Sequence, residues 1–451
     1  MNAPNRILSG AALIAACLLL LGAVTTAIAE QARLDASLAT PILLEGMRQN
    51  AYLRVAVTGE PLPDEAERTP VNMAIVLDRS GSMQGEKIAA AREAAKRAID
   101  RLHPDDIISV VAYESTVQVL VPATRATDTE SIYAAIDGVQ AGGSTALFAG
   151  VSKGAGEIRK FLSKDRVNRI VLLSDGLANI GPSSPGELGD LGTALGKEGI
   201  AVSTMGLGLG YNEDLMTKLA MASDGNHMFV ENAVDLERAY ALEFGDALSV
   251  VAQDVEMRIT CSTGVRPVRV LGREATIDGQ VIRTSLNQLA SGQTRYVIVE
   301  LEIPAHNAEV TAAVADVAIG YLDMGTRDRI EQTRTVVAQF TESQEMVERK
   351  TDPEIMASVV QQIGAERNSL ALALRDEGKI DEARVILQSN GAFLLDNAAR
   401  FNSEQLRKDG LTNEFMSENL DPESYVRSRK IGKEYQYSVK KQQVVELEPK
   451  E

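Results

Sequence analysis

The feature that most constrains this chain is a regular alternation of apolar and amphipathic segments between residues 71 and 250. The apolar segments are short and rich in Val and Ile, which is typical of parallel strands buried on both faces. The longer amphipathic segments are typical of helices that cover those faces. The alternation therefore predicts a doubly wound, Rossmann-like α/β domain over residues 71–250. The expected strands are Met73–Leu77, Ile107–Ala112, Arg169–Leu173, Ile200–Gly206 and His227–Glu231, and the expected helices are Glu86–Leu102, Glu130–Val139, Phe148–Leu162, Leu188–Lys197, Asn212–Ala222 and Val234–Ser249.

The pattern changes in residues 251–342, where apolar and polar side chains alternate singly. Segments such as Val255–Thr260 and Tyr296–Ile303 show this alternation, and turn signals such as Asp278-Gly279 separate them. Alternation with a period of two predicts antiparallel strands, here a β-sandwich. The N-terminal segment 30–70 contains a similar strand at 51–57, which is too short to form a domain alone. We expect it to join the sandwich, so that the α/β domain is inserted into the sandwich.

Residues 350–405 have a helical pattern with a turn at Glu377-Gly378-Lys379. The pattern predicts a helical hairpin that packs on the body of the protein. Its turn also resembles one tetratricopeptide unit, but a single unit cannot bury its apolar face alone. Residues 406–451 are polar and weakly patterned, and six Lys or Arg fall between Arg427 and Lys441. We expect a solvated polar tail, with a basic docking site as the alternative.

Residues 1–29 have the pattern of an export signal. Arg6 supplies the positive charge, Ile7 to Val24 is apolar, and Ala27-Ile28-Ala29 is a small-x-small cleavage site. Two alternatives remain open, an uncleaved membrane anchor and lipidation of Cys17. In each case we expect an exported protein, periplasmic or extracellular. After cleavage Cys261 is the sole cysteine, so an intrachain disulfide is excluded.

Charge and motif content exclude several function classes. The formal net charge of −17 argues against non-specific nucleic-acid binding. No apolar stretch after residue 29 is long enough to span a membrane. The three histidines, His103, His227 and His306, are isolated, and neither a His-Glu-x-x-His zinc motif nor a Gly-x-Ser-x-Gly elbow is present. We therefore expect a protein that is not an enzyme.

Three polar loops are expected at one edge of the α/β sheet. Asp78-Arg79-Ser80-Gly81-Ser82 follows the first expected strand, Gly142-Gly143-Ser144-Thr145 precedes a helix, and Ser174-Asp175-Gly176 ends a later strand. The carboxyl ends of the strands in such a sheet form its ligand-binding edge. Carboxylate and hydroxyl oxygens are the ligands that small hard cations prefer. The three loops therefore predict a metal site.

With these motifs, the chain resembles a von Willebrand factor type A (VWA) domain with a metal-ion-dependent adhesion site (MIDAS). The resemblance covers roughly residues 70–250. It implies five coordinating positions, namely Asp78, Ser80, Ser82, Thr145 and Asp175. The whole layout is similar to that of bacterial exported proteins labelled as relatives of calcium-activated chloride channel regulators or of inter-alpha-trypsin inhibitor heavy chains.

The resemblance also implies a function. Three neutral hydroxyl ligands favour Mg2+ or Mn2+ over the larger Ca2+. If Asp175 acts through water, the ion keeps net positive charge, and an Asp or Glu of a protein partner can complete its coordination. We therefore expect a metal-dependent adhesion or scaffold protein. The alternative is a structural subunit of a cell-envelope assembly in which the metal only stabilises the domain.

Overall fold

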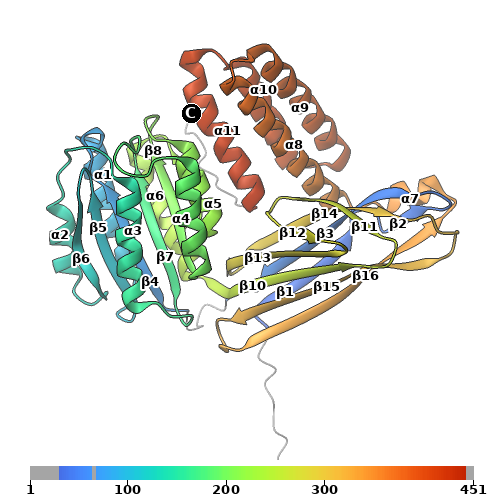
Figure 1. Ribbon diagram of the computed structural model, residues 1–451, viewed down its shortest axis with the longest axis horizontal. Coiled ribbons are helices and arrows are strands. Elements are labelled where there is room, and N and C mark those ends of the chain that lie inside the picture. Colours follow the sequence, from blue (N-terminus) through green and yellow to red (C-terminus); the bar gives the residue numbers. More distant parts are fainter. Residues whose placement is uncertain (1–29, 63–67, 443–451) are drawn as a thin grey trace, which may run out of the picture.

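The computed structural model describes residues 30–62 and 68–442 as three packed parts (Figure 1). An α/β domain lies at one end, a β-sandwich at the other, and a group of C-terminal helices lies above both (Figure 1). The expected signal at residues 1–29 lies outside the described residues. Among the helices that the structure describes, none is both long and apolar enough to span a bilayer.

The α/β domain is built on a six-stranded sheet with the order β6-β5-β4-β7-β8-β9. All pairs are parallel except β5 with β6. Every residue of β4, β5, β7 and β8 is buried, which explains why these strands are apolar throughout. The strands are β4 (Val71–Asp78), β5 (Ile107–Tyr113), β6 (Val117–Arg125), β7 (Val167–Ser174), β8 (Ile200–Leu207) and β9 (His227–Val230).

Helices cover both faces of this sheet and form a separate apolar core on each. One core joins α1, α2 and α6 to the sheet, and the other joins α3, α4 and α5. The predicted fold class is therefore confirmed for this part of the chain. The helices are α1 (Glu86–Ile99), α2 (Thr129–Asp137), α3 (Leu147–Ile158), α4 (Pro185–Lys197), α5 (Glu213–Ser223) and α6 (Leu236–Leu248).

The β-sandwich consists of two sheets with the orders β1-β3-β14-β11 and β12-β13-β10-β15-β16-β2. Strand β3 pairs antiparallel with both β1 and β14, so chain on either side of the α/β domain builds the same sheet. The α/β domain is thus inserted into the sandwich. The strands are β1 (Ala32–Leu38), β2 (Ile42–Leu44), β3 (Gln49–Gly59), β10 (Val250–Cys261), β11 (Arg266–Leu271), β12 (Thr276–Asp278), β13 (Val281–Ala290), β14 (Thr294–Ile303), β15 (Thr311–Asp323) and β16 (Arg329–Thr341).

The C-terminal region differs from the expected hairpin and polar tail. After α7 (Gln344–Lys350), α8 (Pro353–Asp376) and α9 (Ile380–Phe401) form the hairpin, but α10 (Glu404–Glu418) and α11 (Pro422–Lys441) continue the bundle. These two helices are polar in sequence because their buried faces use amides and tyrosines as well as aliphatic residues. Asn413 bonds to both Asn368 and Asn390 inside the bundle, and Tyr437 of α11 is 2% exposed.

Helix α11 returns to the α/β domain and packs along its edge strand β9 (Figure 1). The Phe229 amide donates to Glu434 Oε1 at 3.0 Å, and the Tyr437 hydroxyl donates to the Gly225 carbonyl at 2.6 Å. An exposed edge strand is open to pairing with other chains, and a helix laid along it prevents this.

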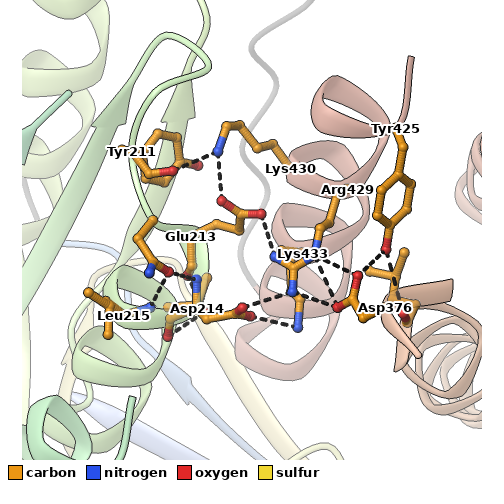
Figure 2. Close-up of polar contacts among 12 residues, drawn as sticks. Tyr211, Glu213, Asp214, Leu215, Asp376, Tyr425, Arg429, Lys430 and Lys433 are labelled. Atoms are coloured by element: carbon orange, nitrogen blue, oxygen red, sulfur yellow. Dashed lines mark hydrogen bonds and ion pairs between the residues drawn. The ribbon is translucent and has the colours of Figure 1, made fainter. Parts of the chain in front are cut away.

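The basic residues expected in a solvated tail pair with acidic residues of α5 (Figure 2). Lys430 Nζ donates to Glu213 Oε2 at 2.6 Å and to the Tyr211 carbonyl at 2.8 Å, and Arg429 pairs with Asp214 at 2.8 Å. The solvated tail is therefore wrong for residues 406–442. The alternative was a basic docking site, and these basic side chains do form a docking contact, but with the α/β domain of the same chain.

Candidate metal centre

The five predicted ligands lie where three loops meet at the carboxyl ends of β4 and β7. Asp78 is the last residue of β4, and Asp175 follows directly after β7. The two strands pair in register, Leu77 opposite Leu173, so their ends reach the same level. Ser80 and Ser82 lie in and beside a short 3-10 turn, Gly81–Met83. Thr145 lies two residues before α3.

The three hydroxyls converge on one point beside Gly176. A Cβ atom built on Gly176 would lie 3.2 Å from Ser82 Oγ, 3.2 Å from Thr145 Oγ1 and 3.8 Å from Ser80 Oγ. The hydroxyls of Ser80 and Ser82 are 3.0 Å apart. A side chain at Gly176 would enter this space, so the glycine keeps it open.

Asp78 is fully buried and receives only neutral donors in the described part of the chain. Oδ1 accepts from the Ser80 amide at 2.8 Å, and Oδ2 accepts from Ser174 Oγ at 2.7 Å and from the Tyr113 hydroxyl at 3.4 Å. Burial raises the pKa of Asp78, although the hydrogen bonds from Ser80 and Ser174 oppose this shift. A buried carboxylate is costly unless a positive charge compensates it. A cation bound here would supply that charge.

Asp175 is buried as well, and both of its oxygens have partners. Oδ1 accepts from Ser82 Oγ at 2.6 Å, and Oδ2 pairs with Lys87 Nζ at 2.5 Å. The hydrogen bond from Ser82 links the Asp175 carboxylate directly to the set of three hydroxyls beside Gly176. All three loops therefore contribute to one site.

Backbone contacts tie the loop that carries Thr145 to its neighbours. The Gly81 amide donates to the Gly143 carbonyl at 3.0 Å, and the Gly142 amide donates to the Arg79 carbonyl at 2.8 Å. Gly143 has φ +77°, which an L side chain rarely adopts. Asn179 Oδ1 accepts from the Thr145 amide at 2.8 Å. Gly142 and Gly143 thus lie close to the backbone of the loop that carries Ser80 and Ser82.

Sequence reasoning missed three residues of the site, Lys87, Ser174 and Tyr113. Lys87 is the second residue of α1, where a positive charge faces the positive end of the helix dipole. That unfavourable position was the one sequence signal for Lys87, because a lysine there is stabilised by an anionic neighbour. Ser174 and Tyr113 reach Asp78 only through the pairing of the strands.

The donor set fits a small hard divalent cation. It contains two carboxylates and three hydroxyls, all oxygen ligands. The described residues contain no cluster of three or more His, Cys, Asp or Glu placed to hold a metal ion. Ser82 is exposed, whereas Asp78, Ser80, Thr145 and Asp175 are buried, so the site opens to solvent on one side.

Comparisons with known proteins identify the α/β domain. Residues 72–241 match the family model of the von Willebrand factor type A domain. The uncharacterized protein sll0103 of Synechocystis sp. is 28% identical over 260 residues, which is 55% of this chain and 61% of that protein. The chain thus spans less than two thirds of that relative's length.

Two solved structures extend the likeness beyond the α/β domain. A von Willebrand factor type A protein from Catenulispora acidiphila has a TM-score of 0.67 at 18% identity, over 84% of this chain and 89% of that one. The ArnB paralog VWA2 from Sulfolobus acidocaldarius has a TM-score of 0.60 at 18% identity, over 92% of this chain and 99% of that one. Since these likenesses cover most of the chain, they show the fold of its three parts together.

Proposed function

We propose that the von Willebrand factor type A domain of residues 72–241 binds a divalent metal ion and, through that ion, an acidic side chain of a protein partner. The observation that carries the proposal is the convergence of three hydroxyls beside Gly176, next to a buried Asp78 whose hydrogen-bond donors among the described residues are all neutral. Type A domains commonly mediate metal-dependent protein interactions. When bound, the ion supplies a positive centre that can accept a carboxylate oxygen.

We propose Mg2+ as the ion, with Mn2+ and Ca2+ as alternatives. Mg2+ takes six oxygen ligands at about 2.0–2.1 Å, whereas Ca2+ takes six to eight at longer distances. The hydroxyls of Ser80 and Ser82 lie only 3.0 Å apart, and compact neutral ligands of this kind suit the smaller ion. Asp78, Ser80, Ser82 and Thr145 would hold it, with Asp175 beside them.

The surroundings of the open side suit a protein partner. Leu177 is 59% exposed two residues after Asp175, and Leu209 is 45% exposed. Leu209 lies in the β8–α5 loop, which contacts the loop at Asp175, because a Cβ atom on the adjacent Gly210 would lie 2.8 Å from the Asp175 carbonyl oxygen. Apolar side chains beside the metal can contact the apolar neighbours of a partner's acidic residue.

The proposal is for a binding protein and not for an enzyme. Ser174, the serine beside Asp175, donates its hydroxyl to Asp78 and has no histidine as a base. His227 is buried and bonds to Thr204, and His306 packs at a tilt against the ring of Phe340 in the sandwich. The proposal also includes export to the periplasm or the exterior, supported by the signal-like residues 1–29.

A capture experiment tests the proposal. Full-length protein is immobilised and exposed to a cell-envelope fraction, once with Mg2+ and once with EDTA. Wild type should capture a partner only with Mg2+, and Asp78→Ala should capture none under either condition. Asp190→Ala serves as the matched control, because Asp190 is exposed on α4.

The structural alternative gives a different result. If the metal only stabilises the domain, EDTA lowers the melting temperature but releases no partner. A partner that both wild type and Asp78→Ala retain in EDTA would contradict metal-mediated capture.

A further inference from the structure

We infer that Lys87 leaves the metal-loaded site with a net positive charge, and thereby makes it selective for an acidic group. The inference rests on the proposed function, because it concerns how the same site chooses its partner. Lys87 is not one of the five predicted ligands, and the inference gives it a role in choosing the partner.

The ammonium of Lys87 is positioned against one particular oxygen. Lys87 Nζ lies 2.5 Å from Asp175 Oδ2, while Asp175 Oδ1 accepts from Ser82 Oγ. The Asp175 side chain is 0% exposed and that of Lys87 is 35% exposed. The lysine thus holds the oxygen of Asp175 that does not contact the hydroxyl ligand, and leaves the oxygen beside Ser82 on the side of the metal site.

The lysine side chain is also confined by the neighbouring loop. A Cβ atom on Gly208, which has φ +68°, would lie 3.8 Å from Lys87 Nζ and 3.9 Å from its Cε. The end of the side chain therefore lies between the β8–α5 loop and Asp175. A lysine in the first turn of a helix opposes the helix dipole, so the ion pair with Asp175 is what favours this position.

The charges of the site show what the lysine changes. Asp78, Asp175 and Lys87 together carry one net negative charge, and a bound divalent ion turns this into one net positive charge. Without Lys87 the same ion would change two negative charges to neutrality. Arg79 and Glu114, a charged pair beside the site, compensate each other at 3.4 Å.

Two consequences follow from this arrangement. The ammonium repels the incoming cation and so weakens metal binding, because charges a few ångströms apart still interact strongly near a protein surface. Once the metal is bound, the remaining positive charge attracts a carboxylate that an electrically neutral site would hold less well. Without metal, the net negative charge repels that carboxylate. Lys87 thus strengthens the capture of an acidic group by the metal-loaded site.

The first test is a Mg2+ titration by calorimetry, with no partner present. Lys87→Met removes both the charge and the hydrogen bond, and Lys87→Gln removes the charge but keeps a donor for Asp175. Both variants should bind Mg2+ about tenfold more tightly than wild type. Lys87→Arg, which keeps the charge, should change the affinity much less. Lys153→Met, an exposed lysine on α3, is the matched control and should bind as wild type does.

The second test uses acetate as a minimal carboxylate. The protein is loaded with Mn2+, and displacement of metal-bound water by acetate is followed by water-proton relaxation. Acetate should bind Lys87→Met and Lys87→Gln several-fold more weakly than wild type and Lys153→Met. Circular dichroism with saturating Mg2+ checks that each variant is folded, and Lys87→Gln provides the answer if Lys87→Met does not fold.

Unchanged or weaker Mg2+ binding in folded Lys87→Gln would overturn the inference, as would equal acetate affinity in wild type and Lys87→Gln. A partner captured without metal would overturn the proposed function instead. The two failures are distinct, because the titrations need no partner.

Discussion

At the metal site, the missing side chain of Gly176 leaves a space. The hydroxyls of Ser80, Ser82 and Thr145 surround the position that a Cβ atom would take. Two of them would lie 3.2 Å from it, which is tighter than ordinary van der Waals contact. A methyl group there would push the hydroxyls apart by a few tenths of an ångström.

We therefore predict that Gly176→Ala weakens Mg2+ binding about tenfold or more, which corresponds to about 1.4 kcal/mol of binding free energy. The fold should remain, since Gly176 lies in the loop that follows β7 and not inside the sheet. Gly156→Ala is the matched control, because a Cβ atom on Gly156 would meet nothing within 4 Å. Calorimetric titration of both variants measures the difference, and equal affinities would contradict the geometry described.

At the scale of residues, the sequence predicts those site residues that belong to short motifs. Asp78, Ser80 and Ser82 share one loop, and Thr145 and Asp175 follow recognisable glycine or strand signals. Lys87, Ser174 and Tyr113 join the site only because β4, β5 and β7 pair side by side in this register. No local pattern specifies that Lys87 reaches a carboxylate 88 residues further along the chain.

At the scale of elements, the sequence predicted the buried parallel strands well, whereas it missed β6 and took α10 and α11 for a polar tail. Strand β6 was missed because it is an antiparallel edge strand in which Val121 is the one buried residue. Helix α11 was taken for a solvated tail because it is rich in Lys and Arg. Arg429, Lys430 and Lys433 meet acidic side chains of α5, which no local pattern could reveal (Figure 2).

Glu434 makes the docking of α11 sensitive to pH. Burial raises the pKa of Glu434 to about 7, although the backbone hydrogen bond from Phe229 opposes this shift. The folded protein therefore binds more protons than the unfolded chain between the ordinary carboxyl pKa and about 7. It follows that the contribution of Glu434 to stability is present at low pH and is lost as the pH rises through about 7.

We predict that Glu434→Gln raises the free energy of unfolding by about 1 kcal/mol at pH 8 and changes it little at pH 5. Denaturant unfolding at the two pH values measures this. Glu423→Gln, an exposed residue in the first turn of the same helix, is the control and should show no such difference. A Glu434→Gln protein that is destabilised more at pH 8 than at pH 5 would contradict the assignment.

At the scale of the whole molecule, Asp224 joins all three parts. It ends α5 in a left-handed conformation, φ +60°. Its carboxylate accepts from the Asn287 amide of β13 at 2.6 Å, from Arg273 at 3.1 Å, and from Lys441 of α11. Burial alone would raise the pKa of Asp224, but Arg273 and Lys441 bring it below the usual value. One carboxylate thus connects the α/β domain, the sandwich and the helices.

We predict that Asp224→Asn lowers the free energy of unfolding at pH 7 by about 3 kcal/mol, because two buried cations lose their shared anion. Since the folded pKa of Asp224 is depressed, its contribution is present at neutral pH and is lost as the pH falls below the ordinary carboxyl pKa. The difference between wild type and Asp224→Asn should therefore shrink in acid. Asp254→Asn, which pairs with Lys164 at the surface, is the control and should cost less than about 1 kcal/mol. Scanning calorimetry at several pH values measures both variants, and a constant difference across pH would contradict the account.

The central claim is that Asp78 and its neighbours hold a divalent cation, and the most direct test is calorimetric titration of wild type and Asp78→Ala with Mg2+. We predict one saturable site in wild type and no detectable binding in Asp78→Ala, with the same circular dichroism spectrum for both. Equal Mg2+ binding by the two proteins would place the ion elsewhere and contradict the account.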